Sequence, residues 1–530
     1  MLKRLLTLAS VALVLPAVAC ADDPNQDENG GTDSAGDGDG DGDVPTDIPA
    51  KGGIQVSGVV VNQGIEVPIA GEAQEWVGPA DRNGVIIVKE RNTFIRAYWT
   101  IPADWSPREI RGTLTLFKPG GEEVVFVDKV LVDGASDPNN FGTRQFLWQV
   151  EGQHMVPGVR FQVELTEVDP AFFDLPADGA ATVSPASGTE LVGVQPEPLE
   201  LEVVIVPVVY NSGGCQTDTR TLTTEQFEGF GLDLLENNPV TEVKLTMREE
   251  PIVRNSPVGA SSDLFGAVSQ ARSADAPGPN VYYYALIDSC GLPSGTLGVA
   301  PTADLPPTKE AETLRFATGR WHSNANPSLA WNTFTHEIGH VQSLRHTNCG
   351  NAAGTEPAYP HEGADIGVWG MSILNGQIFP PTVAKDYMSY CSPEWVSDFT
   401  WRETARQIGI LTSWEYEYSI DDEPAAKLMQ GVVHEDGREE WWMVRGELAS
   451  GTPGESATVT DAEGRTMVVD MSVHEVPDEE GTRFVQIELP TTLDAVSEIE
   501  LSTQRLVSPG AGAGPLTRKL DVSTVKPLEP

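Results

Sequence analysis

The sequence predicts a multidomain fold in which an α/β domain is flanked by N-terminal and C-terminal β-sandwich domains. Short strands with alternating apolar residues, separated by Gly, Pro and Asp turns, fill residues 53–196. Strands then alternate with helices over 197–420, and short alternating strands return over 421–530. A chain of 530 residues is long enough for three or four domains.

The first twenty residues have the pattern of an export signal. Two basic residues precede an apolar stretch too short to span a membrane stably, and small residues precede Cys20. The tetrad Ala-Val-Ala-Cys resembles the lipobox of bacterial lipoproteins, which implies a lipid on Cys20 and a place in the outer membrane or at the cell surface. An ordinary cleaved signal is the alternative, and it too predicts export. No second apolar run approaches spanning length, so membrane attachment is expected through the lipid anchor alone.

Residues 21–52 are predicted to form a disordered linker, because they are rich in Asp, Gly and Asn and have nothing apolar to bury. Asp37, Asp39 and Asp41 match the first positions of a calcium-binding EF-hand loop. However, Ile48 stands where such a loop ends on glutamate, and no flanking helices are evident. A solvated linker is favoured, and calcium as a cofactor is unsupported.

The charge of the chain excludes one class of partner. It carries 34 basic and 78 acidic residues, for a formal net charge of -44. A surface of this charge repels nucleic acid and anionic lipid head groups, so no nucleic-acid partner is expected.

The predicted elements follow from apolar periodicity and turn residues. Strands of the first β-domain are expected at 54–61, 84–90, 93–100, 113–117, 123–132 and 160–167. In the α/β domain, strands are expected at 201–210, 242–249 and 281–288, and helices at 223–238, 261–274 and 396–411. The last domain has strand patterns at 431–437, 441–448, 465–472, 483–490 and 498–503.

The run HEIGHVQSLRH, residues 336–346, contains the residues of a metal site. His336 and His340 are four apart, so both imidazoles lie on one helix face and can reach one metal ion. His346 would complete three ligands after a turn, and Zn²⁺ in catalytic sites takes three protein ligands and keeps one open position. Glu337 would direct its carboxylate at a water in that position.

The helix itself is supported by its apolar residues. Phe334, Ile338 and Val341 share one face, which leaves the two histidines on roughly the opposite face. The same helix can therefore pack on a core and present a metal site.

The pattern HExxHxxxxxH, followed by DYMSYC, resembles the metzincin clan of zinc endopeptidases, whose usual form is HExxHxxGxxH with a later methionine turn. The resemblance covers roughly residues 200–415. It implies that Met388 forms a hydrophobic floor under the metal. It also implies that Tyr390 is a weak fifth ligand that stabilises the oxyanion, the alternative being a packed aromatic side chain. Ser343 stands where the clan has glycine, and a non-glycine residue in the left-handed conformation costs on the order of 1 kcal/mol.

Five cysteines leave four once Cys20 is acylated, an even number in an oxidising compartment. A bridge between Cys349 and Cys391 would tie the two loops that shape the metal site, and Cys215 would then pair with Cys290. The competing idea is that Cys215 is free and caps the zinc in a latent form, but no propeptide motif supports it.

Two further histidines lie near the motif. His361 belongs to a glycine-rich, apolar segment between the third ligand and the methionine turn, and His322 precedes the zinc helix. Both are expected to line the substrate cleft or lie on the surface, because the metal already has three histidines and needs an open place.

The expected function is that of an exported zinc endopeptidase that hydrolyses an extended polypeptide or glycoprotein substrate. Glu337 would act as the general base, and the substrate would lie along the edge strand of the sheet. An adhesive or binding lipoprotein without turnover is the alternative, although a purely structural zinc site needs no general base and fills all four positions. A third possibility is a narrow protease for glycoproteins that depends on its β-domains.

Overall fold

The computed structural model describes residues 5–9, 48–140, 142–288, 290, 295–302, 307–322, 326–414, 427–450, 455–503 and 516–528. The predicted lipid attachment at Cys20 and nearly all of the predicted linker lie outside these residues. Of the predicted signal, only β1 (Leu5–Ala9) is described, as a strand antiparallel to β13 (Glu242–Met247). None of the helices in the described ranges is long and apolar enough to cross a membrane.

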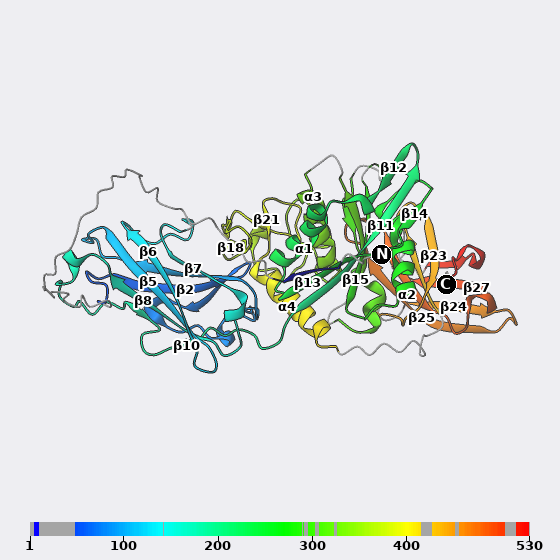
Figure 1. Ribbon diagram of the computed structural model, residues 1–530. Coiled ribbons are helices and arrows are strands. Elements are labelled where there is room, and N and C mark those ends of the chain that lie inside the picture. The colour runs from blue at the N-terminus through cyan, green and yellow to red at the C-terminus, as the bar shows by residue number, and fades with distance from the viewer. Residues whose placement is uncertain are drawn as a thin grey trace, which may run out of the picture.

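The molecule is a β-rich, multidomain chain. In Figure 1 an all-β region lies at one end, a sheet with helices occupies the middle, and a second all-β region lies at the other end. The histidine helix is in the middle region.

The N-terminal region is a sandwich of two antiparallel sheets, as predicted. One sheet has the order β3-β2-β4-β7, and the other has the order β10-β8-β5-β6 with β9 paired to β8. Alternate residues of β5 are fully buried, because one face of the strand meets the core. Strands of this region are β2 (Gln55–Asn62), β3 (Glu66–Ala70), β4 (Thr93–Thr100), β5 (Arg108–Phe117), β6 (Glu123–Val132), β7 (Phe146–Val150), β8 (Arg160–Glu167), β9 (Val183–Ser184) and β10 (Glu190–Leu191).

One predicted strand of this sandwich is wrong. Residues 84–90 form a loop, although Ile87 and Val88 are buried as the apolar pattern suggested. The side-chain amide of Gln63 takes the place of a neighbouring strand, because it accepts from the Val88 N–H at 2.6 Å and donates to the Val88 carbonyl at 2.9 Å. A buried segment can thus satisfy its backbone without joining a sheet.

The middle region is built on a mixed sheet of order β1-β13-β11-β15-β17-β16. The four inner strands run parallel, whereas β1 and β16 are antiparallel to their neighbours at the two edges. Strand bounds are β11 (Glu200–Ser212), β12 (Cys215–Asp218), β14 (Ile252–Arg254), β15 (Val281–Asp288), β16 (Gly298–Val299) and β17 (Phe316–Trp321). Strand β17 had no clear sequence signal, because its six residues include only three apolar ones that do not alternate regularly.

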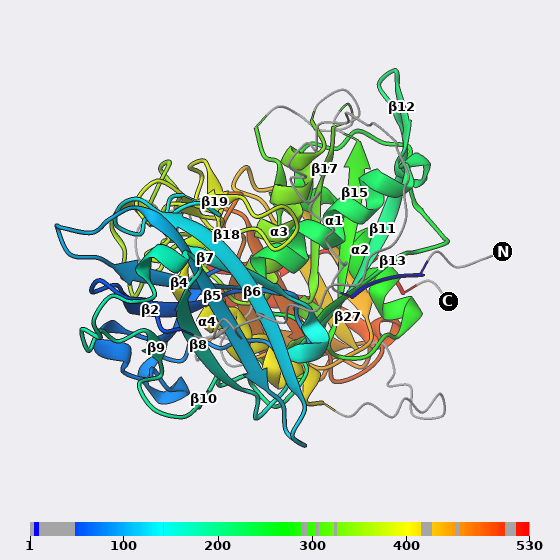
Figure 2. The same ribbon diagram turned by 60° about the vertical axis from the view of Figure 1, so that its left-hand side comes forward.

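Helices cover both faces of this sheet (Figure 2). α1 (Thr224–Asn237) and α3 (Ser328–Val341) pack together on one face, and α2 (Phe265–Asp275) packs on the other. α2 begins later than predicted, because Ser261–Leu264 form a 3₁₀ turn. α4 (Asp398–Thr412) closes the region, and four short strands lie between α3 and α4: β18 (Gly370–Met371), β19 (Ile378–Phe379), β20 (Lys385–Asp386) and β21 (Glu394–Trp395).

The C-terminal region is one antiparallel sheet of order β23-β22-β26-β25-β24-β27-β28. A β-sandwich was predicted here. The long strand β25 pairs with β24 over its first half and with β26 over its second, which joins the two halves into one sheet folded over a core of its own. Its strands are β22 (Leu428–Val433), β23 (Glu439–Val444), β24 (Ser456–Asp461), β25 (Thr466–Glu475), β26 (Arg483–Glu488), β27 (Val496–Thr503) and β28 (Leu516–Leu520).

Apolar cores run across the region borders. The core of the N-terminal sandwich includes Met388 and Trp401 from the middle region. On the opposite side, Phe265 of α2 shares a core with Trp442 and Phe484 of the C-terminal sheet. Both β-regions are therefore packed directly against the middle region, which carries the histidines.

Candidate metal centre

Helix α3 presents His336 and His340 because its other face is fixed in the core. Phe334 is fully buried, with its ring centroid 4.8 Å from that of Tyr284 and 5.3 Å from that of Phe230. The two histidines leave the helix one turn apart, with ring centroids separated by 4.8 Å. The face assignment made from the sequence matches this arrangement.

The third histidine reaches the same place through a left-handed turn. Ser343 has φ 67°, the conformation for which the metzincin pattern uses glycine. After this turn His346 is fully buried, and its backbone bridges to Thr355. Serine therefore occupies the turn without preventing the chain from returning to the helix.

Each imidazole is oriented by a backbone carbonyl. The Nδ1 atoms of His336, His340 and His346 lie 2.7, 2.8 and 2.7 Å from the carbonyl oxygens of Tyr387, Leu344 and Ala353, respectively. Because a carbonyl only accepts, each Nδ1 carries the proton and donates it. All three Nε2 atoms are then left with lone pairs, which is the form that binds a metal ion.

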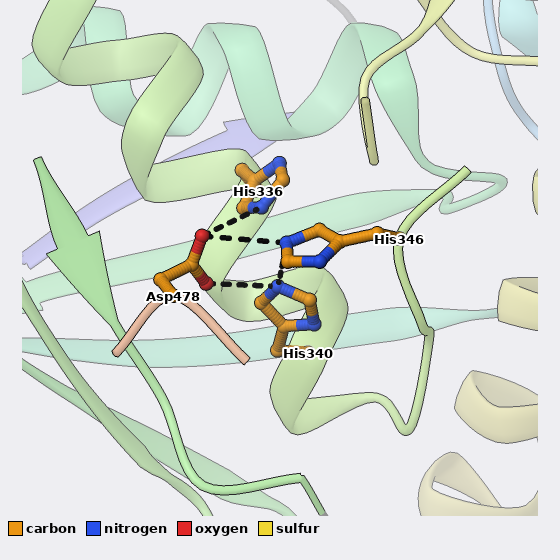
Figure 3. A group of neighbouring side chains, drawn as sticks. All are labelled: His336, His340, His346 and Asp478. Carbon is orange, nitrogen blue, oxygen red and sulfur yellow. Dashed lines mark hydrogen bonds and ion pairs between the residues drawn. The ribbon is translucent and has the colours of Figure 1, made fainter. Parts of the chain in front are cut away.

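A fourth donor comes from the C-terminal region. Asp478, in the loop between β25 and β26, points its carboxylate into the group of histidines (Figure 3). Asp478 Oδ2 is 3.0 Å from His340 Nε2, and Oδ1 is 3.3 Å from His346 Nε2 and 3.7 Å from His336 Nε2. His474 and Asp478 are four residues apart in the sequence, but His474 lies in strand β25 and does not join the group, and only the fold brings Asp478 to the three histidines.

The four side chains are close enough together to hold a metal ion. Their donor atoms all lie within 4.8 Å of one another, and His340 Nε2 is 3.1 Å from His346 Nε2. Ligand atoms at zinc bond lengths in a tetrahedron are about 3.3 Å apart. Two imidazole nitrogens without protons repel each other at such a distance, and a shared cation removes the repulsion. The residues therefore form a group that could hold a metal ion, with a donor set that zinc prefers.

Burial and charge act differently on these groups: despite burial, the neighbouring Asp478 raises the pKa of His336. Burial lowers the pKa of His340 to about 4, so its imidazole is neutral at physiological pH. Burial opposes ionisation of Asp478, but the imidazoles that it faces, His340 foremost, bring the pKa of this carboxyl well below its usual value. Asp478 is therefore held as a carboxylate.

Glu337 lies beside the group in a cavity of about 450 Å³. Its side chain is buried, and its Oε2 atom has no hydrogen-bond partner. Burial, with the nearby charges of Asp478 and Glu479, raises the pKa of Glu337 well above its usual value. Gly298 of β16 contacts this side chain so closely that a Cβ there would lie 2.6 Å from Glu337 Oε1. The edge strand of the sheet thus borders the same cavity.

Met388 and Tyr390 both lie at the centre. Met388 is fully buried, and a Cβ at Gly339 of α3 would lie 2.4 Å from its sulfur, so Met388 packs directly against the histidine helix. Tyr390 is 46% exposed, with its ring centroid 4.9 Å from that of His346, and its hydroxyl donates to Asp478 Oδ1 at 2.6 Å. Tyr390 is therefore a partly exposed group at the site and is not packed in a core.

Two disulfides are present, with the predicted pairing. Cys349–Cys391 joins the loop after His346 to the loop after Met388. Cys215–Cys290 joins the β-hairpin of β11 and β12 to the chain after β15, so Cys215 is not free to cap a metal. Two such bridges indicate an oxidising, extracytoplasmic environment.

His361 and His322 do not join the metal group. His361 Nε2 lies 2.6 Å from Asp398 Oδ1, at the first turn of α4. His322 follows β17, and burial together with the charge of Arg320 lowers its pKa. Neither is among the four clustered donors.

Comparison with known proteins adds no assignment. No protein-family model matches this chain, and no curated protein matches it either. The interpretation of the centre therefore rests on its own residues.

Proposed function

We propose that the chain is an exported zinc endopeptidase of metzincin type, with His336, His340 and His346 as the zinc ligands. The observation that carries the proposal is the convergence of three Nε2 atoms, each on an imidazole whose Nδ1 faces a backbone carbonyl, next to a buried glutamate that has an unpartnered oxygen. A structural zinc site has no use for this carboxylate, whereas hydrolysis needs a base at this place.

A bound zinc ion would supply Lewis acidity, lowering the pKa of an attacking water toward about 7 and polarising the substrate carbonyl. Glu337 takes the proton of the attacking water and later passes it to the leaving amine.

Tyr390 and β16 would position the substrate and the developing charge. The hydroxyl of Tyr390 lies close enough to the histidines to donate to the oxyanion once Asp478 is elsewhere. An extended substrate would add its backbone to β16, because this strand is an edge of the sheet and lines the cavity. Protein or glycoprotein substrates fit this mode of binding.

A binding protein without turnover is the second candidate, and Asp478 is the observation that favours it. Four protein ligands around one metal are typical of structural zinc sites. In either case we propose that Cys20 carries a lipid and that the chain is held at the outer membrane or cell surface.

The test uses the full chain, Asp478→Ala, and the double variant Asp478→Ala/Glu337→Gln, each analysed for zinc content and for hydrolysis of a quenched peptide library. The proposal expects bound zinc in all three proteins, hydrolysis by Asp478→Ala, and loss of hydrolysis in the double variant. Zinc without hydrolysis in all three proteins would favour the binding protein.

A further inference from the structure

Asp478 stands where a catalytic zinc site keeps its open position. Three histidines leave one place for water, and the carboxylate of Asp478 lies 3.0 to 3.7 Å from all three Nε2 atoms. We propose that Asp478 is an intramolecular inhibitor: it supplies the fourth zinc ligand and keeps the hydrolase latent until the loop 476–482 moves. This inference rests on the proposed function and names the regulation of that same site.

The loop is fastened on both sides of the metal group. Glu479, the next residue, accepts from the Ser262 N–H at 3.1 Å and from the Ser262 hydroxyl. On the other side, Tyr390 donates its hydroxyl to Asp478. Asp478 is thus held between two anchors of the middle region, which reduces the entropy it loses on binding a metal.

Displacement of the loop would release two catalytic features together. The first is the fourth coordination position, and the second is the hydroxyl of Tyr390, which Asp478 now occupies. Displacement of this one loop can therefore convert the inhibited site into one that can bind water and substrate.

The loop alone must move to open the site, because the rest of the C-terminal sheet cannot move away without exposing the apolar core that it shares with the middle region. Val476, at which the loop begins, and Phe484, just after its end, are buried together with Val206 and Phe265 of the middle region and hold the two ends of the loop in place. By contrast, Glu480 within the loop is exposed. Movement or cleavage of 476–482 is therefore the route to the open state.

The experiment compares the full chain with Asp478→Ala and with Glu480→Ala, which removes the same charge from the same loop without touching the histidines. The proteins are loaded with Co²⁺, whose visible absorption changes when a carboxylate ligand is replaced by water. We expect a changed spectrum and a Co²⁺ affinity lowered about 10- to 100-fold in Asp478→Ala only. Hydrolysis of the peptide library should rise at least about tenfold in the same variant.

The outcomes separate the two proposals. An unchanged spectrum in Asp478→Ala would overturn the ligand role. Equal hydrolysis by the full chain and Asp478→Ala would overturn the inhibition and leave the hydrolase standing. A changed Co²⁺ spectrum in Asp478→Ala with no hydrolysis by any of the proteins would contradict the proposed function and support Asp478 as a ligand of a structural metal site.

An independent observation concerns the cavity beside the centre. The residues that line it include three carboxylates, Glu337, Glu394 and Asp478, and none of its described lining residues is Lys or Arg. The side-chain amide of Asn332 donates to Glu394 Oε2 at 2.9 Å. Tyr387 also lines the cavity, and its hydroxyl is buried without a hydrogen-bond partner.

We infer that this cavity takes a lysine or arginine side chain of the substrate next to the scissile bond, with Glu394 as its partner. The position follows because His336 and Glu337 line the same cavity, so a side chain bound there belongs to a residue at the reacting carbonyl. The charge follows because a half-buried carboxylate gains most from a cation, and a guanidinium can pair with it through two hydrogen bonds. A neighbouring cavity that shares Glu394 also has the carboxyl groups of Asp233 and Glu236 in its lining.

Binding can be measured without turnover in Asp478→Ala/Glu337→Gln, with two peptides that differ only in Arg or norleucine at one position. We expect about tenfold tighter binding of the Arg peptide, lost when Glu394→Gln is added and kept with the control Glu435→Gln, which lies outside this cavity. Equal binding of the two peptides would overturn the inference. Tighter binding of the Arg peptide with no hydrolysis by Asp478→Ala would support the binding pocket and contradict the proposed protease function.

Discussion

The two β-regions contact the metal centre in different ways. The N-terminal sandwich contacts it through apolar side chains and bonds to main-chain carbonyls: the indole N–H of Trp395 donates to the Gly64 carbonyl at 2.7 Å, and Met388 lies in the core of the sandwich. The C-terminal sheet contacts it through the carboxylate of Asp478.

This difference assigns different roles to the two regions. Shared cores and backbone bonds break only when the fold opens, so the N-terminal sandwich should set the stability of the floor of the site. A loop held by a few polar contacts exchanges them more readily, so the C-terminal loop is suited to control. Variants in the two regions should therefore affect different measurements.

The largest expected effect is on the N-terminal contact. Trp401 is fully buried in the sandwich core, and its indole N–H donates to the Ile86 carbonyl at 3.2 Å. Trp401→Ala should lower the free energy of unfolding by about 3 to 5 kcal/mol, measured by urea denaturation. The control Trp76→Ala removes a 39% exposed side chain of the same sandwich and should cost much less. If the two variants lost the same free energy of unfolding, burial in the core shared with the middle region would add no stability beyond that of a partly exposed tryptophan.

The next effect concerns the polar contact on the C-terminal side. Asp263 lies 3.2 Å from His434 Nε2 and 3.0 Å from Arg438, both of which belong to the C-terminal sheet. Despite burial, these bonds lower the pKa of Asp263, so its stabilising contribution is present above the unfolded carboxyl pKa and is lost as pH falls through the folded value.

Asp263→Asn should therefore reduce the free energy of unfolding by about 1 to 3 kcal/mol at pH 7. The difference from the parent protein should shrink below about pH 4. Asp436→Asn is the matched control, because Asp436 pairs with the same arginine at 2.8 Å but is exposed. If the loss of stability in Asp263→Asn did not change with pH, packing and not charge would account for the contribution of this contact between the middle region and the C-terminal sheet.

The smallest effect is expected at the turn between the second and third histidines. Ser343 has φ 67°, so Ser343→Gly should raise the free energy of unfolding by about 1 kcal/mol. The same change at Ser413, where φ is -73°, should lower it by about 0.5 to 1 kcal/mol. Thermal unfolding of the two variants checks the opposite signs, and loss of stability in both would contradict the turn argument.

The sequence predicted the local part of the centre. His336, His340 and the apolar face of their helix follow from helical spacing, and the pairing of Cys349 with Cys391 followed from the idea that two loops meet at the histidines. Local periodicity fixes such features because they depend on residues close in the chain.

Asp478 could not be predicted in this way. It reaches the histidines only because the loop between β25 and β26 lies against the middle region. The packing of Val476 and Phe484 in a shared core fixes this contact. The loop at 84–90 escaped prediction for a related reason: the side chain of Gln63 satisfies its backbone, where the apolar pattern suggested a strand. Both features depend on contacts between residues far apart in the sequence.

The most direct test of the central claim is the zinc content of the full chain, His346→Ala and His361→Ala, measured after dialysis against a weak chelator. The account predicts about one zinc ion per chain in the parent and in His361→Ala, whose histidine pairs with Asp398 away from the centre, and almost none in His346→Ala. Retention of zinc by His346→Ala, or its absence from the parent protein, would contradict the account.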